Sequence, residues 1–271
     1  MFNLISSQAS KLVGLTDKIK NKSKTKLVTI TSGKGGVGKS TFTANIAFLL
    51  GQKGLKVAVL DADIGLANMQ VLFDIRPKTS FFDYIDGRKT LDEIILKTEY
   101  RNVSLIAGKS GYEYSNHSNT FVFTRVAEDI ISLNEFDILL VDTGAGLNDY
   151  VKEFLAISDN ILALTTTDPS ALTDVYSLMK MLSIGKSKLM LCFNHTKNYK
   201  IGETISNSLV KLAKKNRLNS DFMVEYIGNV STSAQISTTG RLRKLFTKEF
   251  TFDESTKQMQ LIIDYLIKNI H

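Results

Sequence analysis

Glycines, lysines and hydroxyl-bearing residues are concentrated in one short segment, residues 33–41, with the order Gly-Lys-Gly-Gly-Val-Gly-Lys-Ser-Thr. Glycines let successive backbone N–H groups turn inward toward one ligand, and the spacing fits the pattern Gly, four residues, Gly-Lys-Ser/Thr. A loop of this kind binds phosphate oxygens. The segment therefore predicts a nucleoside triphosphate site, with contacts from Gly33, Lys34, Gly35, Gly36, Val37, Gly38, Lys39, Ser40 and Thr41.

The flanking residues supply the setting that such a loop requires. An apolar run over 27–30 precedes it and a helical pattern over 39–52 follows it, so a helix N-terminus adds a favourable partial charge for phosphate. Lys39 can reach the outer phosphates, and the Ser40 hydroxyl can join Mg²⁺. The alternative is a glycine-rich turn without a ligand, which the flanking pattern disfavours.

Carboxylates follow two further apolar runs. Asp61 and Asp63 come after residues 57–60, and Asp142 comes after residues 136–141. Carboxyl ends of parallel strands meet at the edge where ligands bind in open α/β sheets, so these groups are expected beside the phosphate loop. Asp61 or Asp142 taken alone would also fit a helix cap. Three motifs in this order favour a nucleotide site.

Strand and helix patterns alternate along the chain, and the strand runs are rich in Val, Ile and Leu without polar alternation. Such strands are buried on both faces, which predicts an α/β fold: one doubly wound, mainly parallel sheet of about seven or eight strands with helices on both faces. We expect strands at 26–31, 56–60, 103–107, 137–141, 160–165, 188–193 and 223–228, and helices near 39–52, 80–87, 91–97, 120–133, 147–157, 170–184, 201–217 and 233–246.

The composition agrees with one large core. The chain has 271 residues, of which 43% are hydrophobic, and a single cysteine, Cys192, in an apolar run that predicts a buried strand position. No disulfide can form within the chain, which fits a reducing cytosol. No apolar stretch approaches the ~20 residues that span a bilayer, and the first residues lack the apolar core of a signal peptide. We expect a cytoplasmic protein.

The second lysine of the loop, Lys34, gives it a resemblance to the MinD/ParA ATPases, whose deviant phosphate loop reads Lys-Gly-Gly-Val-Gly-Lys-Ser. The resemblance implies an ATP-dependent sandwich homodimer in which Lys34 reaches the partner's nucleotide and stabilises the transferring phosphoryl group. The alternative for Lys34 is a solvated loop lysine. The lone cysteine sets the chain apart from the iron–sulfur relatives of this fold, which need a Cys-x-x-Cys pair.

The resemblance also implies roles for the acidic segments. Lys34, Lys39 and Asp63 would be catalytic, with Asp63 orienting the attacking water, and Ser40, Asp61 and Asp142 would lie near Mg²⁺. Thr143 and Gly144 would sense the outer phosphate. The two switch segments would comprise Asp61, Asp63, Gly65, Asn68, Asp142, Thr143 and Gly144.

The adenine site is less clearly marked. By the same resemblance, Asn194 follows the sixth strand where an adenine-binding Asn is expected, and Val230 with Ser231 would pack on the purine. A proline usual at the position of Ser231 is absent. A turn residue at the end of a strand is the alternative for Asn194.

The two switch sequences, Asp-Ala-Asp-Ile-Gly-Leu-Ala-Asn and Asp-Thr-Gly-Ala-Gly, resemble the FlhG (FleN, YlxH) branch more than the division or partition ATPases. The likeness runs from about residue 26 to the C-terminus. It implies control of flagellar number or placement through an FlhF-type GTPase, flagellar switch and C-ring proteins, or a flagellar transcription regulator. The alternatives are a MinD-type division-site regulator, a ParA-type DNA-partition ATPase, and a nucleotide-binding scaffold with little hydrolysis.

Residues 1–25 precede the first strand, are rich in Lys, Ser and Asn, and are expected to form a mobile arm. Gln8, Ala9 and Leu12 match the FlhF-activating element of the FlhG branch, Asp-Gln-Ala-x-x-Leu-Arg. Ser7 and Val13 replace its two charged residues. The arm therefore predicts a helix that folds on a partner.

Residues 251–271 predict an amphipathic helix capped by Ser255, with an apolar face of Met259, Ile262, Ile263, Leu266, Ile267 and Ile270. By resemblance this face would bind the inner membrane when ATP-dependent dimerisation frees it. The alternative is a helix packed permanently on the body, because its polar face has few basic residues.

The net charge of +7 and the pI near 9.2 raise nucleic acid as a partner. The basic residues are scattered, with local density at 18–26, 211–217 and 241–248, of which the last is the best candidate patch for DNA or lipid headgroups. A solvated lysine-rich surface is the commoner meaning of such a charge. We expect that DNA is not a partner.

Overall fold

The computed structural model describes residues 23–63, 68–109, 122–197, 199–216 and 218–270. In these residues one sheet has the strand order β3-β4-β2-β5-β1-β6-β7-β8, and every adjacent pair is parallel except β3 with β4. The predicted single, mainly parallel sheet is confirmed. The strands are β1 (Lys26–Ser32), β2 (Val57–Ala62), β3 (Ile95–Lys97), β4 (Val103–Ile106), β5 (Ile138–Ala145), β6 (Asn160–Thr165), β7 (Lys188–Thr196) and β8 (Met223–Ser231).

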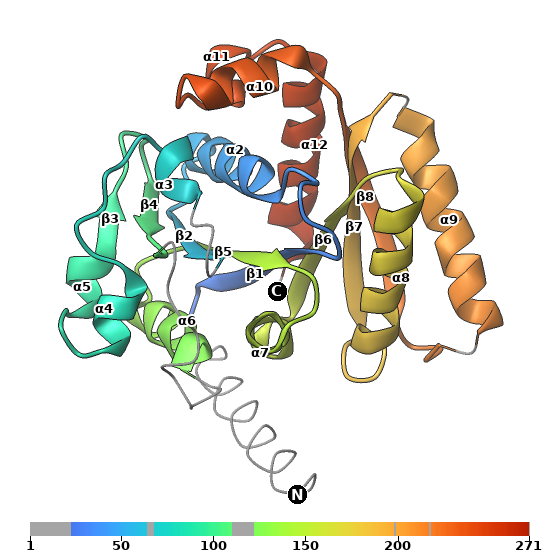
Figure 1. Cartoon of the computed structure of the whole chain (residues 1–271), viewed down its shortest axis with the longest axis horizontal. Coiled ribbons are helices and arrows are strands. Elements are labelled where there is room, and N and C mark those ends of the chain that lie inside the picture. Colours follow the sequence, from blue (N-terminus) through green and yellow to red (C-terminus); the bar gives the residue numbers. More distant parts are fainter. Residues whose placement is uncertain (1–22, 64–67, 110–121, 198, 217, 271) are drawn as a thin grey trace, which may run out of the picture.

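Helices cover both faces of this sheet (Figure 1). On one face lie α2 and α12, and α6, α7 and α8 lie on the other. The helices are α2 (Lys39–Gln52), α3 (Met69–Leu72), α4 (Phe81–Ile85), α5 (Leu91–Ile94), α6 (Val122–Leu133), α7 (Asp149–Ile157), α8 (Pro169–Leu182), α9 (Tyr199–Lys215), α10 (Ala234–Arg241), α11 (Phe246–Glu249) and α12 (Glu254–Asn269).

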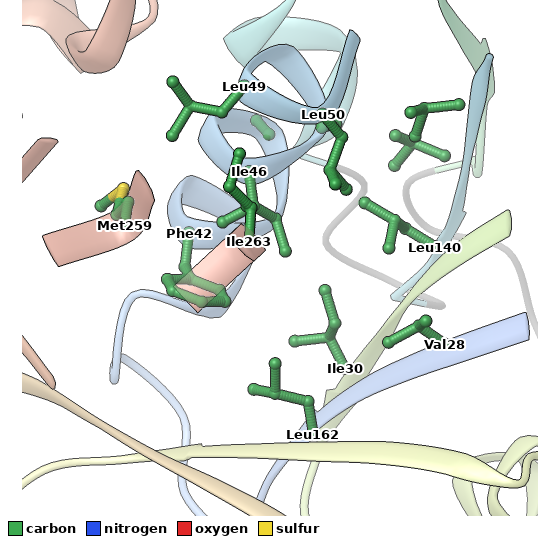
Figure 2. Packing of buried hydrophobic residues seen from close by; sticks show 14 of the residues in the cluster. Val28, Ile30, Phe42, Ile46, Leu49, Leu50, Leu140, Leu162, Met259 and Ile263 are labelled. Atoms are coloured by element: carbon green, nitrogen blue, oxygen red, sulfur yellow. The ribbon is translucent and has the colours of Figure 1, made fainter. Parts of the chain in front are cut away.

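The strands are apolar on both faces because both faces are covered. In β1, Val28 and Ile30 pack in the cluster that contains α2 and α12, whereas Leu27 packs with α6 and α7. Figure 2 shows the first of these clusters, in which Phe42 and Ile46 of α2 meet side chains of α12 and of the central strands. Runs without polar alternation thus follow from burial on two sides.

Two expected helices differ from the structure. The helix expected over 91–97 ends at Ile94, and Ile95–Lys97 instead forms the edge strand β3, antiparallel to β4. A capping box between Thr90 and Glu93 starts α5, but the apolar residues that follow pair with the sheet. The helix expected over 233–246 breaks near Arg243, whose φ of 54° lies in the left-handed region, and becomes α10 and α11.

The start of the described chain is tied to the body. Ser23 donates to the carbonyl of Ile131 (2.8 Å), and the buried Thr25 hydroxyl donates to the carbonyl of Phe136 (2.7 Å). Residues 23–25 therefore belong to the body, and the expected boundary at residue 25 is a few residues too late. Gln8, Ala9 and Leu12 lie outside the described residues, and their partner role stays a prediction.

Helix α12 is part of the core. Met259, Ile262, Ile263 and Leu266 are buried in the cluster that includes α2 and the central strands, while Ile267 is exposed and Ile270 half-buried. The described residues contain no helix with the length and apolar character needed to cross a bilayer.

The predicted cap of α12 is wrong. Asp253, not Ser255, is the N-cap residue: its carboxylate accepts from the Ser255 N–H (2.8 Å). The buried Ser255 hydroxyl donates to the carbonyl of Ser231 instead (3.1 Å), so it fixes the helix to the end of β8.

Candidate functional site

The phosphate loop joins β1 to α2 at the centre of the sheet. β1 lies between β5 and β6, and α2 begins at Lys39 directly after the loop. Gly38 has a φ of 87°, and a Cβ there would lie 2.5 Å from the Asn194 side-chain nitrogen. A Cβ on Gly33 would collide with Asp174 of α8. Glycine is therefore required at both positions, because Asn194 packs directly against the backbone of Gly38 and Asp174 against that of Gly33.

A cavity of about 460 Å³ lies over this loop. Most of the phosphate-loop residues expected from the sequence line it, as do Asp63 and Asn68. Sequence reasoning missed four lining positions, which belong to the ends of β1 and β5 and to α3; of these, Ala145 alone lies within a motif, the second switch sequence. The complete lining is Ser32, Gly35, Gly36, Val37, Gly38, Lys39, Ser40, Thr41, Asp63, Asn68, Val71, Leu72 and Ala145.

Asp142 holds the first residues of α2 in place from the end of β5. Its carboxylate accepts from the Ser40 hydroxyl (2.6 Å), the Thr43 hydroxyl (3.1 Å) and the Lys39 ammonium (3.3 Å). Lys39 is 7% exposed and Asp142 is fully buried, so this is a buried ion pair with further hydrogen bonds. Thr43 is a partner of Asp142 that the sequence analysis did not identify.

Asp61 lies beside Asp142 because the two are register partners on β2 and β5. Its carboxylate accepts from the backbone N–H of Met69 (3.1 Å), which ties the strand to α3. Burial, and then the negative charge of Asp142, raise the pKa of Asp61 to about 7.

These groups fit a magnesium ion. Mg²⁺ takes oxygen ligands and keeps part of its hydration shell. The Ser40 hydroxyl and the carboxylates of Asp61 and Asp142 form an all-oxygen donor set at one sheet edge. A divalent cation would neutralise the repulsion between the two carboxylates, so the residues present suit the ion.

Asp63 lines the cavity at the end of β2. Burial is the main cause that raises its pKa, the charge of Lys39 opposes the rise, and Asp142 adds to it. A Cβ on Gly144 would lie 3.2 Å from an Asp63 carboxylate oxygen and would collide with the Tyr150 hydroxyl. Gly144 thus leaves room for Asp63 and Tyr150. Its neighbour Thr143 is buried, and its hydroxyl donates to the carbonyl of Ile30 (3.1 Å).

Lys34 does not line the cavity, although it belongs to the same loop. Its ammonium donates to the carboxylate of Asp168 (2.7 Å) and to the Ser170 hydroxyl at the start of α8. The hydrogen bond from Lys34 lowers the pKa of Asp168. Both side chains of the ion pair are about half exposed, at 43% and 50%, so water competes for this contact.

The expected adenine residues are used partly by the protein itself. Asn194 lies within β7, is buried, and donates to the carbonyl of Val37 (2.8 Å), which supports the phosphate loop from below. At the end of β8, Val230 is buried, and the Ser231 N–H donates to Gln258 of α12 (2.7 Å). Contacts of these residues with a base stay a prediction. Gly65 lies outside the described residues.

The chain matches known proteins along nearly its whole length. The ParA family model, described as NUBPL iron-transfer P-loop NTPase, matches residues 23–267. The flagellum site-determining protein YlxH of Helicobacter pylori is 36% identical over 251 residues, which are 92% of this chain and 84% of that protein. The antiactivator FleN of Pseudomonas aeruginosa is 31% identical, covering 74% of this chain and 72% of its own.

Solved structures agree on the fold. The septum site-determining protein MinD of Pyrococcus horikoshii, complexed with Mg-ADP, superimposes with a TM-score of 0.76 at 20% identity, covering 90% of this chain and 96% of that one. Together with the phosphate loop and the buried carboxylates beside it, these likenesses place the chain in the MinD/ParA family of P-loop NTPases, with the flagellar proteins YlxH and FleN among its relatives.

Proposed function

We propose that this chain is a Mg²⁺-dependent ATPase that alternates between an ADP-bound or nucleotide-free monomer and an ATP-bound sandwich dimer. One observation carries the proposal. Of the two lysines in the phosphate loop, Lys39 lines the nucleotide cavity, whereas Lys34 does not and is instead held by exposed contacts with Asp168 and Ser170. A lysine that does not serve its own cavity is available to the cavity of a second copy.

The remaining residues divide the chemistry in the usual way for phosphoryl transfer, in which positioning and charge stabilisation dominate. Lys39 and the loop N–H groups would bind the phosphates. Ser40, Asp61 and Asp142 would hold Mg²⁺, which when bound neutralises phosphate charge. Asp63 would accept a hydrogen bond from the attacking water and so orient it toward the outer phosphate. Lys34 of the second copy would offset the charge that develops during transfer.

Dimerisation can be measured directly. Asp63→Ala removes the water-orienting carboxylate but none of the loop contacts, so it should bind ATP, hydrolyse it slowly and accumulate as a dimer. Light scattering after size exclusion should give twice the 30.1 kDa of one chain with ATP, and 30.1 kDa with ADP. A monomer at saturating ATP would rule the sandwich out.

For the cellular role, we propose regulation of flagellar number or placement, through an FlhF-type GTPase and other flagellar proteins. The names of the two relatives, a flagellum site-determining protein and an antiactivator, support this choice. Deleting the gene should give cells with too many or misplaced flagella. Misplaced septa or lost plasmids, with normal flagella, would instead favour the division or partition alternatives.

We propose that membrane association, when ATP drives it, uses α12. Undocking the helix would expose four large apolar side chains on α12, at about 1.5–3 kcal/mol each, and the facing side chains of α2 as well. Nucleotide can shift such a balance only if the dimer docks the helix more weakly than the monomer does. Anionic liposomes should therefore sediment the ATP-bound Asp63→Ala protein and leave ADP-bound protein in solution. Equal sedimentation in both states would mean that α12 is only a core helix.

A further inference from the structure

A second cavity, of about 560 Å³, lies beside α3 and shares Val71 with the cavity over the phosphate loop. Its lining comes from five parts of the chain: α3, the segment 75–80 that follows it, Asp83 of α4, residues 108–109 after β4, and Arg243 between α10 and α11. None of the sequence motifs described above includes these residues, apart from the basic stretch that contains Arg243. The cavity is thus a separate feature that the nucleotide chemistry does not explain.

Positive charge dominates this cavity. Arg76, Lys78, Lys109 and Arg243 line it, and all four side chains are exposed. Arg243 has one acidic neighbour, Asp74, at 3.3 Å. In the described part of the chain, no acidic side chain forms an ion pair with the other three.

The one acidic residue in the lining does not change this balance. Asp83 is already bound by Arg88 at 2.7 Å, a residue outside the lining. Counting the described residues alone, the cavity therefore presents about three uncompensated positive charges to whatever enters it.

Part of the cavity lining is apolar, and we call this part the floor. Val71 of α3 is 42% exposed, and Ile75 and Pro77 are half-buried beside it. An apolar centre with charged side chains around its edge is the anatomy of a protein interface, whereas a small-molecule site encloses most of its ligand. Here the four cationic side chains, which we call the rim, are exposed. This favours a peptide that brings carboxylates to the rim and an apolar side chain to the floor.

We propose that this cavity is a docking site for an acidic segment of a protein partner. The segment would seat one apolar residue on Val71, Ile75 and Pro77 and place its carboxylates against Arg76, Lys78 and Lys109. Exposed ion pairs of this kind increase the association rate and orient the partner more than they increase the binding affinity. A bound acidic residue would also compete with Asp74 for Arg243, since that exposed ion pair is weak.

The site shares a wall with the nucleotide cavity, which gives it a regulatory meaning that rests on the proposed function. Val71 lines both cavities, and Leu72 lines the nucleotide side. The first residue of α3, Met69, is hydrogen-bonded to Asp61 beside the magnesium position. A change of nucleotide that moves α3 would change the floor on which the partner sits. Partner affinity and nucleotide affinity are then coupled in both directions.

The test uses the full chain and a short fluorescein-labelled peptide of alternating leucine and glutamate, followed by fluorescence anisotropy. Arg76→Gln/Lys78→Gln/Lys109→Gln should weaken peptide binding about tenfold or more in low salt, because three rim charges are lost. The matched control, Lys180→Gln/Lys211→Gln/Lys257→Gln, removes the same charge from exposed positions outside the cavity and should bind like the unaltered chain. Equal losses in the two variants, or no binding by the unaltered chain, would overturn the site.

Charge reversal keeps the result independent of a general loss of fold. Arg76→Glu/Lys78→Glu should lose the leucine–glutamate peptide and gain a leucine–lysine peptide. Inorganic phosphate that displaces the peptide at micromolar concentration would mean that the cavity takes a small anion and would overturn the protein partner. Peptide affinity that is equal with ADP and with ATP would overturn the coupling while leaving the site. Failure of the ATP dimer with peptide binding intact would count against the proposed function alone.

Discussion

The N-terminus and the flank of α2 contact the rest of the protein through different kinds of interaction. At the N-terminus of α2, the Lys39 ammonium forms a buried ion pair with Asp142, and the Asp61 carboxylate lies beside Asp142. Along its flank α2 meets α12, and there Phe42, Ile46 and Ile263 belong to one buried hydrophobic cluster (Figure 2). The first contact depends on residue type and spacing, and the second on volume.

This difference explains how specific each sequence signal is. A buried charge must have a partner at hydrogen-bond distance, so few sequences satisfy the Lys39–Asp142 arrangement. An apolar helix face can be buried against any apolar surface that is large enough, whether protein or lipid, because the hydrophobic effect has no directional requirement. The sequence of the phosphate loop therefore predicts phosphate binding. The apolar face of α12 predicts that the helix is buried, but not whether protein or lipid buries it.

The largest expected effect lies at the charged end of α2. Lys39→Ala should lower ATP affinity about a hundredfold or more, because a charge-assisted contact to phosphate is lost and Asp142 keeps a buried charge without its cation. Isothermal titration calorimetry measures this. Lys53→Ala, just beyond the other end of α2, loses only a surface pair with Asp264 and should bind ATP normally. Similar affinities in both variants would remove Lys39 from the site.

On the apolar flank the effect should appear in stability instead. Ile263→Ala should lower the free energy of unfolding by about 2–5 kcal/mol, because it leaves a cavity against α2. Leu261→Ala, on the same helix but 69% exposed, should stay within about 0.5 kcal/mol. Urea unfolding of the ADP-bound protein compares them. Equal, small effects would show that α12 does not hold the core in this state.

The comparison also separates what the sequence predicts from what it leaves open. The order of strands and helices and the positions of Asp61, Asp63 and Asp142 follow from local pattern, because parallel strands end at one edge. The conversion of Ile95–Lys97 into an edge strand does not, since an available partner strand, β4, overrides a helical signal. The contact of Asn194 with Val37 is also not predictable, because it joins segments far apart in the chain.

One further buried titratable side chain, Glu153, has neither an ion-pair partner nor a hydrogen-bond partner among the described residues. Glu153 of α7 is 8% exposed, and in the part of the chain that the structure describes neither of its carboxylate oxygens has a hydrogen-bond partner. Burial, and then the charge of Asp149, raise the pKa of Glu153 from 4.5 to about 8. Glu153 ionises near pH 4.5 in the unfolded chain and near pH 8 in the folded chain. Between these values a rise in pH therefore lowers the contribution of Glu153 to the free energy of unfolding.

Glu153→Gln should remove this loss. The thermal midpoint of the variant should exceed that of the unaltered chain by about 3 °C or more at pH 8, and the gap should close near pH 4.5. Differential scanning fluorimetry across this range measures it. Asp149→Asn, which keeps the buried carboxyl, should retain most of the pH dependence. A gap that is constant with pH would mean that Glu153 is already ionised in the fold.

The smallest expected effect concerns the exposed contact of Lys34. Asp168→Ala should free Lys34 at a cost of about 0–1 kcal/mol per subunit, so ATP-dependent dimerisation, which breaks two such pairs, should strengthen by at most about thirtyfold. Sedimentation velocity at a series of protein concentrations gives the dimer constant. Lys152→Ala breaks a comparable surface pair on α7 and should leave that constant unchanged. A loss of dimerisation in Asp168→Ala would mean that Asp168 has a further role in the dimer.

The central claim, that Lys34 serves the nucleotide of a second copy, is tested most directly by mixing two inactive proteins. Lys34→Ala keeps Asp63, and Asp63→Ala keeps Lys34, so only a mixed dimer contains a complete site. Because each subunit of a two-fold dimer supplies the other, an equal mixture should recover up to about a quarter of the unaltered turnover. If Lys34 acts within its own subunit, no dimer in the mixture has a complete site, and the mixture will remain as inactive as its parts.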